Sequence, residues 1–168
     1  MNTFKEITPE ELTDNAFHLI NKDWMLVAAE KNGKTNMMTA SWGGIGVLWG
    51  KPVAFIFIRP QRYTKEFIDS ADTLSLSFFD ESHRPALNYC GKISGRDEDK
   101  IAGSGLTLAH HGPTPYFEEA RLVMECRKLY VQEMDPAGFI DNESKTKWYA
   151  DNDYHTVYVA AIEHIQKR

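Results

Sequence analysis

Two arginines and two hydroxyl side chains stand together in the stretch Arg59-Pro60-Gln61-Arg62-Tyr63-Thr64, directly after an apolar run. Guanidinium groups bind phosphate oxygens in a planar, bidentate geometry, and the free amides at the start of a helix also favour an anion. Residues 52–58 predict a buried strand, and Thr64 is suited to cap a helix that begins after it. The stretch therefore predicts an anion site. These residues alone leave open the alternative of a solvated surface pair of arginines.

A second stretch, Thr39-Ala40-Ser41-Trp42-Gly43-Gly44, suits contact with a flat ring. Small residues let the backbone approach a planar ligand, and they offer amides and hydroxyls to its polar edge. A β-bulge or bend in a barrel is the alternative for the same composition. A third stretch, residues 89–100, mixes glycines, a hydroxyl and three cations that suit a phosphate, although its Asp97-Glu98-Asp99 run dilutes the positive charge.

The elements that must position these stretches are mostly strands. The order Thr8-Pro9-Glu10-Glu11 is that of a capping box and predicts an N-terminal helix over residues 8–20. Asn32-Gly33 predicts a tight hairpin turn. Strands are expected at residues 24–30, 35–41, 45–49, 52–58, 73–79, 121–132 and 155–165, short helices at 84–90 and 97–102, and a loop at 103–116. We expect one domain over residues 1–168, mainly β with short helices (α+β), folded as a barrel.

Composition narrows the partners and the compartment. The chain has 19 Lys and Arg against 24 Asp and Glu, and this net charge of -5 argues against nucleic acid as a partner. No apolar stretch reaches the roughly 20 residues that span a bilayer, and no signal peptide pattern is present, so we expect a cytoplasmic protein without a membrane partner. Cys90 and Cys126 form no Cys-x-x-Cys pair and are expected to be reduced thiols. His110-His111 has no evident ligand partner, so no metal site is predicted.

The motifs, taken in their order along residues 15–165, resemble the flavin reductase-like family, which includes flavoredoxins. The strings that carry the resemblance are Thr39-Ala40-Ser41-Trp42-Gly43-Gly44, Lys51-Pro52-Val53, Arg59-Pro60-Gln61-Arg62-Tyr63-Thr64, Ser75-Leu76-Ser77-Phe78-Phe79, Tyr89-Cys90-Gly91, Ser94-Gly95-Arg96-Asp97 and Tyr154-His155-Thr156. Each string is weak alone, whereas their order and spacing are specific. The resemblance implies an FMN-binding split β-barrel of the antiparallel Greek-key type. It also implies a homodimer with the flavin near the subunit interface.

The resemblance further implies roles for individual residues. Those expected beside the isoalloxazine and ribityl chain are Thr39, Ala40, Ser41 and Trp42, those expected around the phosphate are Arg59, Arg62, Tyr63 and Thr64, and those expected to close the site are Cys90, Lys92 and Ser94. Arg96 or Lys100 are alternatives to Lys92 and Ser94. His155 resembles a catalytic histidine near the nicotinamide face, and its alternative is a strand-start histidine bonded to a carbonyl. Trp148, Tyr149 and Tyr154 are candidate dimer anchors, with core packing as the alternative.

The activity implied by the resemblance is hydride transfer from NADH or NADPH to FMN, and electron transfer onward to free flavin, a small oxidant or a redox protein. Because the flavin accepts the hydride, the protein needs no catalytic triad. One alternative is a flavoprotein electron carrier without a nicotinamide site of its own. Another is a barrel that binds haem or a different flat ligand, or that only associates with proteins.

Overall fold

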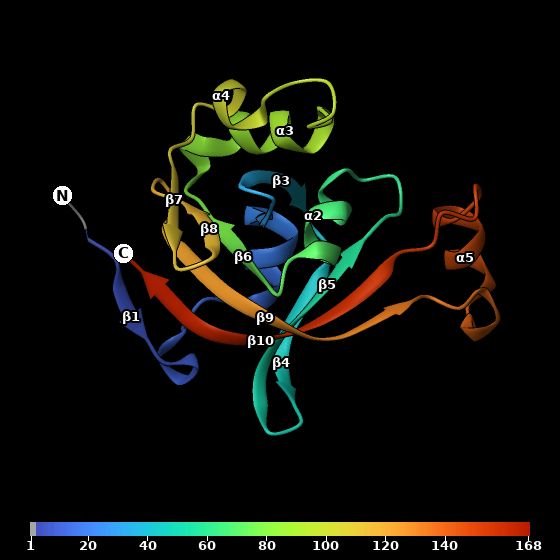
Figure 1. Ribbon diagram of the computed structural model, residues 1–168. Coiled ribbons are helices and arrows are strands. Elements are labelled where there is room, and N and C mark those ends of the chain that lie inside the picture. Colours follow the sequence, from blue (N-terminus) through green and yellow to red (C-terminus); the bar gives the residue numbers. More distant parts are fainter. Residues whose placement is uncertain (1–2) are drawn as a thin grey trace.

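One antiparallel sheet forms the body of the protein in the computed structural model, which describes residues 3–168 (Figure 1). The strands are β1 (Lys5–Ile7), β2 (Met25–Lys31), β3 (Lys34–Ala40), β4 (Gly43–Leu48), β5 (Lys51–Ile58), β6 (Thr73–Phe78), β7 (Leu108–His111), β8 (Thr114–Phe117), β9 (Leu122–Glu133) and β10 (Thr156–Lys167). The main sheet has the order β3-β2-β6-β9-β10-β5-β4, β1 pairs with the end of β10, and β7 pairs with β8. The predicted mainly β, antiparallel fold is confirmed.

The helices are short and connect or cover the strands. They are α1 (Ala16–His18), α2 (Thr64–Ser70), α3 (Arg84–Lys92), α4 (Lys100–Ser104) and α5 (Asn142–Trp148). Helical turns of the 3₁₀ type occupy Pro9–Glu11, Glu81–His83 and Pro136–Gly138, and a π-helical turn occupies Leu19–Asp23. The sheet, and not the helices, therefore sets the geometry of the molecule.

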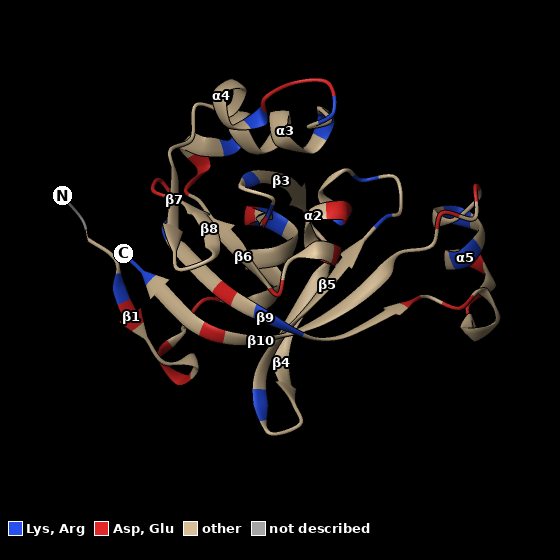
Figure 2. Cartoon of the chain, viewed as in Figure 1, with Lys and Arg blue, Asp and Glu red and all other residues tan. Residues whose placement is uncertain are grey.

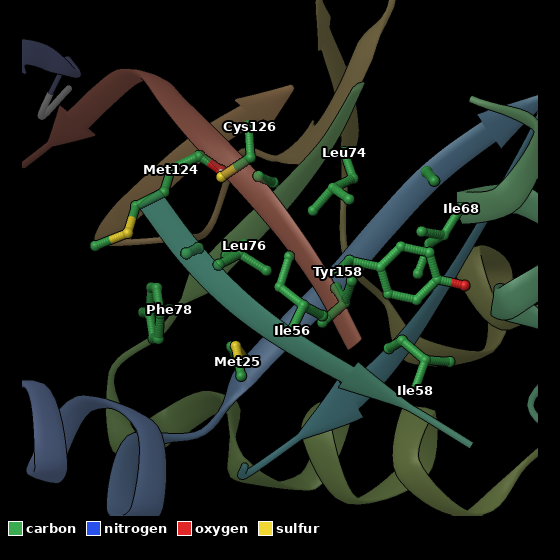
Figure 3. Packing of buried hydrophobic residues seen from close by; sticks show 14 of the residues in the cluster. Met25, Ile56, Ile58, Ile68, Leu74, Leu76, Phe78, Met124, Cys126 and Tyr158 are labelled. Atoms are coloured by element: carbon green, nitrogen blue, oxygen red, sulfur yellow. The ribbon is translucent and has the colours of Figure 1, made fainter. Parts of the chain in front are cut away.

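The main hydrophobic cluster joins strands from across the whole sheet. Side chains from β2, β5, β6, β9 and β10 meet in it (Figure 3). On β5, Ile56 and Ile58 are fully buried in this cluster, whereas the alternate residues Phe55 and Phe57 lie half-buried on the opposite face. Each fully buried large apolar side chain contributes about 1.5–3 kcal/mol, so this cluster is a principal source of stability. Phe57 is thereby left to face the functional region.

The β2–β3 hairpin follows the sequence prediction. Asn32 and Gly33 have φ angles of 52° and 73°, and the flanking Lys31 and Lys34 are paired. Two successive positive φ values define the turn that matches the natural twist of paired strands. The hairpin fixes the register of β3, and it thereby places Asn36 and residues 39–42 beside the end of β5.

Strands β9 and β10 are 12 residues each and run beyond the core. Their paired far ends carry residues 134–155, which we call the arm, and α5 lies in it well away from the sheet body (Figure 1). Register shifts between Val159 and Ala160 and between Ile162 and His164 bend this long ladder. The sequence did not predict α5, which is capped by the Asp141 carboxylate at the Glu143 amide.

The predicted continuous N-terminal helix is wrong. Glu11 accepts the Thr8 amide at 2.7 Å as a capping box requires, but the helix ends after one turn because Leu12 is extended. Asn15 then caps a separate helical turn by accepting the His18 amide. Asp14, between the two turns, is held by Arg121 and by Lys167, and these ion pairs fix the break.

The predicted loop at residues 103–116 is also wrong, because it contains the β7–β8 hairpin. Gly112, with φ of 56°, makes the turn, and Thr114 is buried with its hydroxyl bonded to that of Thr73. Ser75 also donates to the Pro115 carbonyl. Packing against β6 thus makes strands of a stretch whose His, Gly and Pro content is typical of a loop.

Candidate functional site

Two adjoining cavities lie where β3, the end of β5 and residues 91–100 meet. The wide cavity, about 210 Å³, is lined by Met38, Thr39, Ala40, Ser41, Trp42, Phe57, Arg59, Arg62 and His155. The narrow cavity, about 160 Å³, is lined by Asn36, Gln61, Arg62, Tyr63, Thr64, Lys92, Ile93, Ser94, Gly95 and Lys100. Arg62 lines both. The structure therefore brings all the predicted site residues except Cys90 to one of two cavities that share Arg62.

Arg62 is a half-buried cation without a carboxylate partner. Its Nη1 donates to the Gly91 carbonyl at 3.0 Å, and it makes no salt bridge within residues 3–168. Burial lowers the pKa of its guanidinium, because withdrawal from water disfavours the charged form. The remaining donors of its guanidinium fork are suited to an anion in either cavity.

Lys100 is a second cation of this kind and is more deeply buried, with 4% of its surface exposed. Its Nζ donates to the Cys90 carbonyl at 2.7 Å, and it too makes no salt bridge among the described residues. Burial, and to a smaller degree the Arg62 charge, lowers the pKa of Lys100 to about 8. Buried lysines are almost always paired. Lys100 was only an alternative in the sequence prediction, because its helical, charged surroundings are typical of a solvated surface.

The end of α3 holds both cations in place. The carbonyls of Cys90 and Gly91, which accept from Lys100 and Arg62, lie in the last turn of this helix. The negative end of a helix dipole stabilises cations there, but carbonyls carry no net charge. The narrow cavity is therefore lined by two fixed positive charges that these carbonyls position without neutralising.

The rest of the narrow cavity is shaped by close polar packing. Asn36 on β3 donates from Nδ2 to the Thr64 hydroxyl at 2.9 Å, and both residues are buried. Thr64 is the first residue of α2 and not its cap, so the predicted capping role is wrong: Tyr63 stands at the cap without a side-chain bond. A Cβ on Gly95 would overlap the Asn36 side chain, so only glycine allows this approach.

Arg59 has a different environment from Arg62, although both were predicted around the phosphate. Its Nη1 binds the Asp153 carboxylate at 2.6 Å, and its Nη2 donates to the Trp148 carbonyl at 2.9 Å. Gln61 also donates to Asp153, at 2.8 Å. Arg59 lines the wide cavity and not the narrow one. It ties the arm to the end of β5.

Aromatic side chains form the wall where the arm meets the wide cavity. The Trp42 and Trp148 rings meet edge to face with centroids 4.9 Å apart, and the Trp42 and His155 centroids are 5.4 Å apart. The same cavity is lined by the small side chains of residues 39–41, of which the Thr39 hydroxyl is already bonded to the Leu87 carbonyl. The result is a slot lined by aromatic and small side chains together with two arginines, which suits a planar ring with polar edges.

His155 is buried beside this slot and is neutral at pH 7. Its Nδ1 lies 2.7 Å from the Tyr149 hydroxyl. Burial, and next the Arg59 charge, lowers the pKa of His155 to about 4. Its partner is thus a hydroxyl and not the carbonyl of the alternative interpretation, and at neutral pH the imidazole holds one proton and no charge.

Cys90 lies apart from the other predicted residues. Its side chain is fully buried in a second hydrophobic cluster with Leu26, Leu87 and Val123, and it lines neither cavity. Only its backbone carbonyl reaches the site, through Lys100. Both cysteines are free thiols.

A metal-binding cluster and a membrane-spanning helix are both absent from residues 3–168. No group of three or more His, Cys, Asp or Glu side chains is arranged to hold a metal ion in this part of the chain. None of its helices combines the length and the apolar character needed to cross a membrane.

Comparison with solved structures identifies the same fold in several proteins. A flavoredoxin from Methanosarcina acetivorans aligns with a TM-score of 0.69 at 20% identity, over 87% of this chain and 68% of that one. An FMN-binding domain of a flavin reductases-like enzyme from Shewanella baltica OS155 aligns with a TM-score of 0.71 at 16% identity, over 99% and 78%. An NADH:FAD oxidoreductase from Streptomyces globisporus aligns with a TM-score of 0.65 at 14% identity, over 87% and 75%. At identities of 14% to 20%, these alignments show that the fold is shared and nothing further.

Comparison of the sequence with models of protein families identifies the family to which the chain belongs. No curated protein matches the chain. The family model described as "Flavin reductase like domain" matches residues 17–168, which include every residue that lines the two cavities. The protein belongs to the flavin reductase-like domain family.

Proposed function

We propose that the protein binds FMN without a covalent bond, with the phosphate in the narrow cavity and the isoalloxazine ring in the wide one. The observation that carries this proposal is the pair of cations, Arg62 and Lys100, that lie withdrawn from water beside the narrow cavity without a carboxylate partner in residues 3–168. A phosphate dianion offsets the free-energy cost of such charges. Two solved neighbours named for flavoredoxin and for FMN binding support the choice of ligand.

The bound flavin supplies the redox chemistry, and the protein contributes orientation, exclusion of water and electrostatics. Residues 39–42 and Phe57 form the walls against which the ring is oriented, and Trp42 with Trp148 shields one side from water. Arg59 lines the same cavity and stabilises negative charge that develops on the ring during reduction. We propose an oxidoreductase that takes a hydride from NADH or NADPH and passes electrons to a flavin, a small oxidant or a redox protein.

His155 contributes as a neutral, positioned ring in this proposal. With its pKa lowered to about 4, it has no charge to lose between pH 6 and 8. Its ring packs against Trp42, and its Nδ1 is occupied by Tyr149. It therefore acts by shape and hydrogen bonding at the reaction face.

A flavoprotein electron carrier without a nicotinamide site is the second candidate. The edge-to-face contact of Trp42 with Trp148 favours it, because Trp42 lines the wide cavity and the Trp148 ring packed against it leaves less room there for a second planar ring. Electron transfer to a protein partner needs only an exposed edge of the cofactor. The two candidate functions differ in whether NADH or NADPH reduces the bound flavin: it does so in the oxidoreductase and not in the electron carrier.

We also propose a homodimer. Four apolar side chains, Val47, Trp49, Tyr130 and Val131, are 76%, 61%, 45% and 48% exposed on the β4–β5 hairpin and the outer half of β9. The Trp49 and Tyr130 rings lie 6.3 Å apart, so these two aromatic side chains form one patch. The β4 hairpin projects beyond the sheet body (Figure 1), and its only colour in Figure 2 is one basic band. Exposed aromatic anchors with few charges around them are typical of a subunit interface.

The first prediction separates the two arginines. Replacement of Arg62 by Ala should weaken FMN binding about ten- to hundredfold, because one charge-assisted contact of about 1.5–3 kcal/mol is lost. Replacement of Arg59 by Ala should weaken FMN less, and Asp153→Asn should reproduce its effect, because both loosen the arm. Equilibrium titration with FMN measures this, with riboflavin as the control ligand that lacks the phosphate. If Arg59→Ala is as harmful as Arg62→Ala while Asp153→Asn has no effect, Arg59 binds the phosphate.

The second prediction concerns Lys100 and pH. Its folded pKa of about 8 lies below the unfolded value of 10.5, so the unfolded chain binds more protons between these values. The flavin-free protein should therefore gain stability as pH rises through this window, whereas FMN binding should weaken from pH 7 to 9 as the ammonium loses its charge. Lys100→Arg should remove this pH dependence, and Lys100→Met should cost at least tenfold in FMN affinity without lowering the melting temperature of the flavin-free protein by more than a few degrees. Native affinity that stays constant from pH 7 to 9 would exclude Lys100 from the phosphate site.

The third prediction tests the activity. Anaerobic mixing of the FMN-loaded protein with NADH or NADPH should bleach the visible flavin absorbance, at a rate that is constant between pH 6 and 8 because His155 does not titrate there. Dithionite serves as the positive control for a reducible flavin. A flavin that dithionite bleaches and neither nicotinamide does establishes the carrier.

The fourth prediction tests the dimer. Trp49→Glu should shift the protein from dimer to monomer in analytical ultracentrifugation, because a charge is placed inside the buried patch. Ile140→Glu is the matched control, since Ile140 is 99% exposed on the arm and outside the patch. A native protein that sediments as a monomer at tens of micromolar contradicts the proposal.

A further inference from the structure

His155, the last residue of the arm, has one ring nitrogen without a partner, although only 6% of its surface is exposed. Nδ1 lies 2.7 Å from the Tyr149 hydroxyl, whereas Nε2 makes no hydrogen bond within residues 3–168. The unpaired polar side-chain atoms that are fully enclosed in this part of the chain are Ser77 Oγ and Arg84 Nη1, and Nε2 is not among them. Nε2 therefore reaches open space, and the cavity that His155 lines is the wide one.

Packing around His155 fixes the direction of its imidazole. Its carbonyl accepts the Met134 amide at 2.9 Å, which continues the pairing of β9 with β10. The Trp42 and Phe57 rings, which line the wide cavity, have centroids 5.4 and 6.5 Å from that of the imidazole. The Tyr149 ring meets the imidazole edge to face with centroids 5.5 Å apart. An imidazole held in this way has little freedom to turn, so what it offers to the wide cavity depends on the position of its proton.

The proton of the neutral imidazole has two possible positions, and the hydrogen bond to Tyr149 distinguishes them. In the first arrangement, the Tyr149 hydroxyl donates to Nδ1 and the ring proton lies on Nε2. In the second, Nδ1–H donates to the Tyr149 oxygen, and the hydroxyl donates to Met134 Sδ, which lies 3.4 Å away. A thioether sulfur is a weak acceptor compared with an imidazole nitrogen, and the nitrogen is also closer, so the first arrangement is favoured.

Both groups hold the protons that the first arrangement needs at neutral pH. Burial raises the pKa of Tyr149, so its hydroxyl stays protonated. Burial, and next the Arg59 charge, lowers the pKa of His155 to about 4, so the imidazole carries one proton and not two.

Tyr149 is fixed by the arm and does not itself line the wide cavity. Its ring stacks on that of Tyr154 with centroids 5.0 Å apart and meets that of Phe139 at 5.6 Å. Its amide donates to the Lys145 carbonyl, which ties it to the end of α5. Any effect of the Tyr149 hydroxyl on a ring in the cavity must therefore pass through His155.

We propose that Tyr149 is a positioning residue that keeps the imidazole proton of His155 on Nε2, so that His155 presents a neutral N–H donor to the wide cavity. The inference rests on the proposed function and deepens it. The donor selects a ring with a hydrogen-bond acceptor at the edge that faces His155, and the carbonyl oxygens and ring nitrogens of an isoalloxazine are such acceptors. No covalent bond forms or breaks.

Nitrogen-15 NMR of the flavin-free protein at pH 7 reads the position of the proton, because protonated and bare ring nitrogens resonate in well-separated regions. His155→Asn identifies the signals of His155 among those of the six histidines. The native protein should show a protonated Nε2 and a bare Nδ1. Tyr149→Phe should move both signals to intermediate positions, because the two tautomers then exchange. Tyr154→Phe is the matched control, since it removes a hydroxyl that is bonded to Asn152 and should change neither signal.

Met134→Leu tests the competing arrangement, because it removes the sulfur acceptor. The His155 signals should stay at their native positions in this variant. A native protein with its proton on Nδ1 overturns the inference, and so does a Tyr149→Phe spectrum identical to the native one.

Addition of FMN to Tyr149→Phe then tests the donor toward the ligand. FMN should return the His155 signals toward a protonated Nε2, because an acceptor on the bound ring selects that tautomer from the mixture. FMN that binds this variant, as measured by its fluorescence, but leaves the tautomer mixture unchanged overturns the inference while the proposed FMN site stands. A native protein that binds no FMN refutes the proposed function itself, whereas the flavin-free spectra still decide the tautomer.

Discussion

Withdrawal of a cation from water without a carboxylate beside it costs free energy. This chain places two such cations in the lining of one small cavity. Lys100 is almost fully buried and Arg62 is half-buried, and the pKa of each is lowered by that burial. A purely structural role is a poor explanation, because an apolar side chain of similar size fills such a position at lower cost. The cost becomes intelligible if an anion completes the site, since the ligand then supplies the missing charge.

The two arginines that follow β5 differ in whether a carboxylate neutralises their charge. Asp153 compensates Arg59 at the wide cavity, whereas nothing in residues 3–168 compensates Arg62 and Lys100 at the narrow one. The positive field therefore rises from the ring slot toward the narrow cavity. A ligand with a neutral planar end and a doubly negative end enters such a gradient in one orientation only. Orientation is thus set by electrostatics before any close contact forms.

Much of the site could be predicted from the sequence, because its segments are local. The β2–β3 turn, the strand before Arg59 and the small-residue stretch at residues 39–42 are short patterns whose structure depends on neighbouring residues. The features that the sequence did not predict depend on contacts between residues far apart in the chain. Arg59 meets Asp153 across 94 residues of chain, and the β7–β8 strands exist because β6 offers them a surface. The burial of Lys100 depends likewise on the way α3, α4 and β3 pack together, which no local pattern encodes.

Strands β9 and β10 are long enough to contribute both to the hydrophobic core and to the border of the wide cavity. Their inner halves pack in the main cluster, where Met124, Cys126 and Tyr158 are buried, whereas their outer ends carry the arm. The arm is held to the sheet body by the bonds of Arg59 and Gln61 to Asp153 and Trp148, and by ring contacts of Trp42 with Trp148 and of His155 with Trp42 and Phe57. The arm thus contacts Arg59 and Trp42, which line the wide cavity, and Gln61, which lines the narrow one, so its position bears on both the ring end and the phosphate end of a bound flavin.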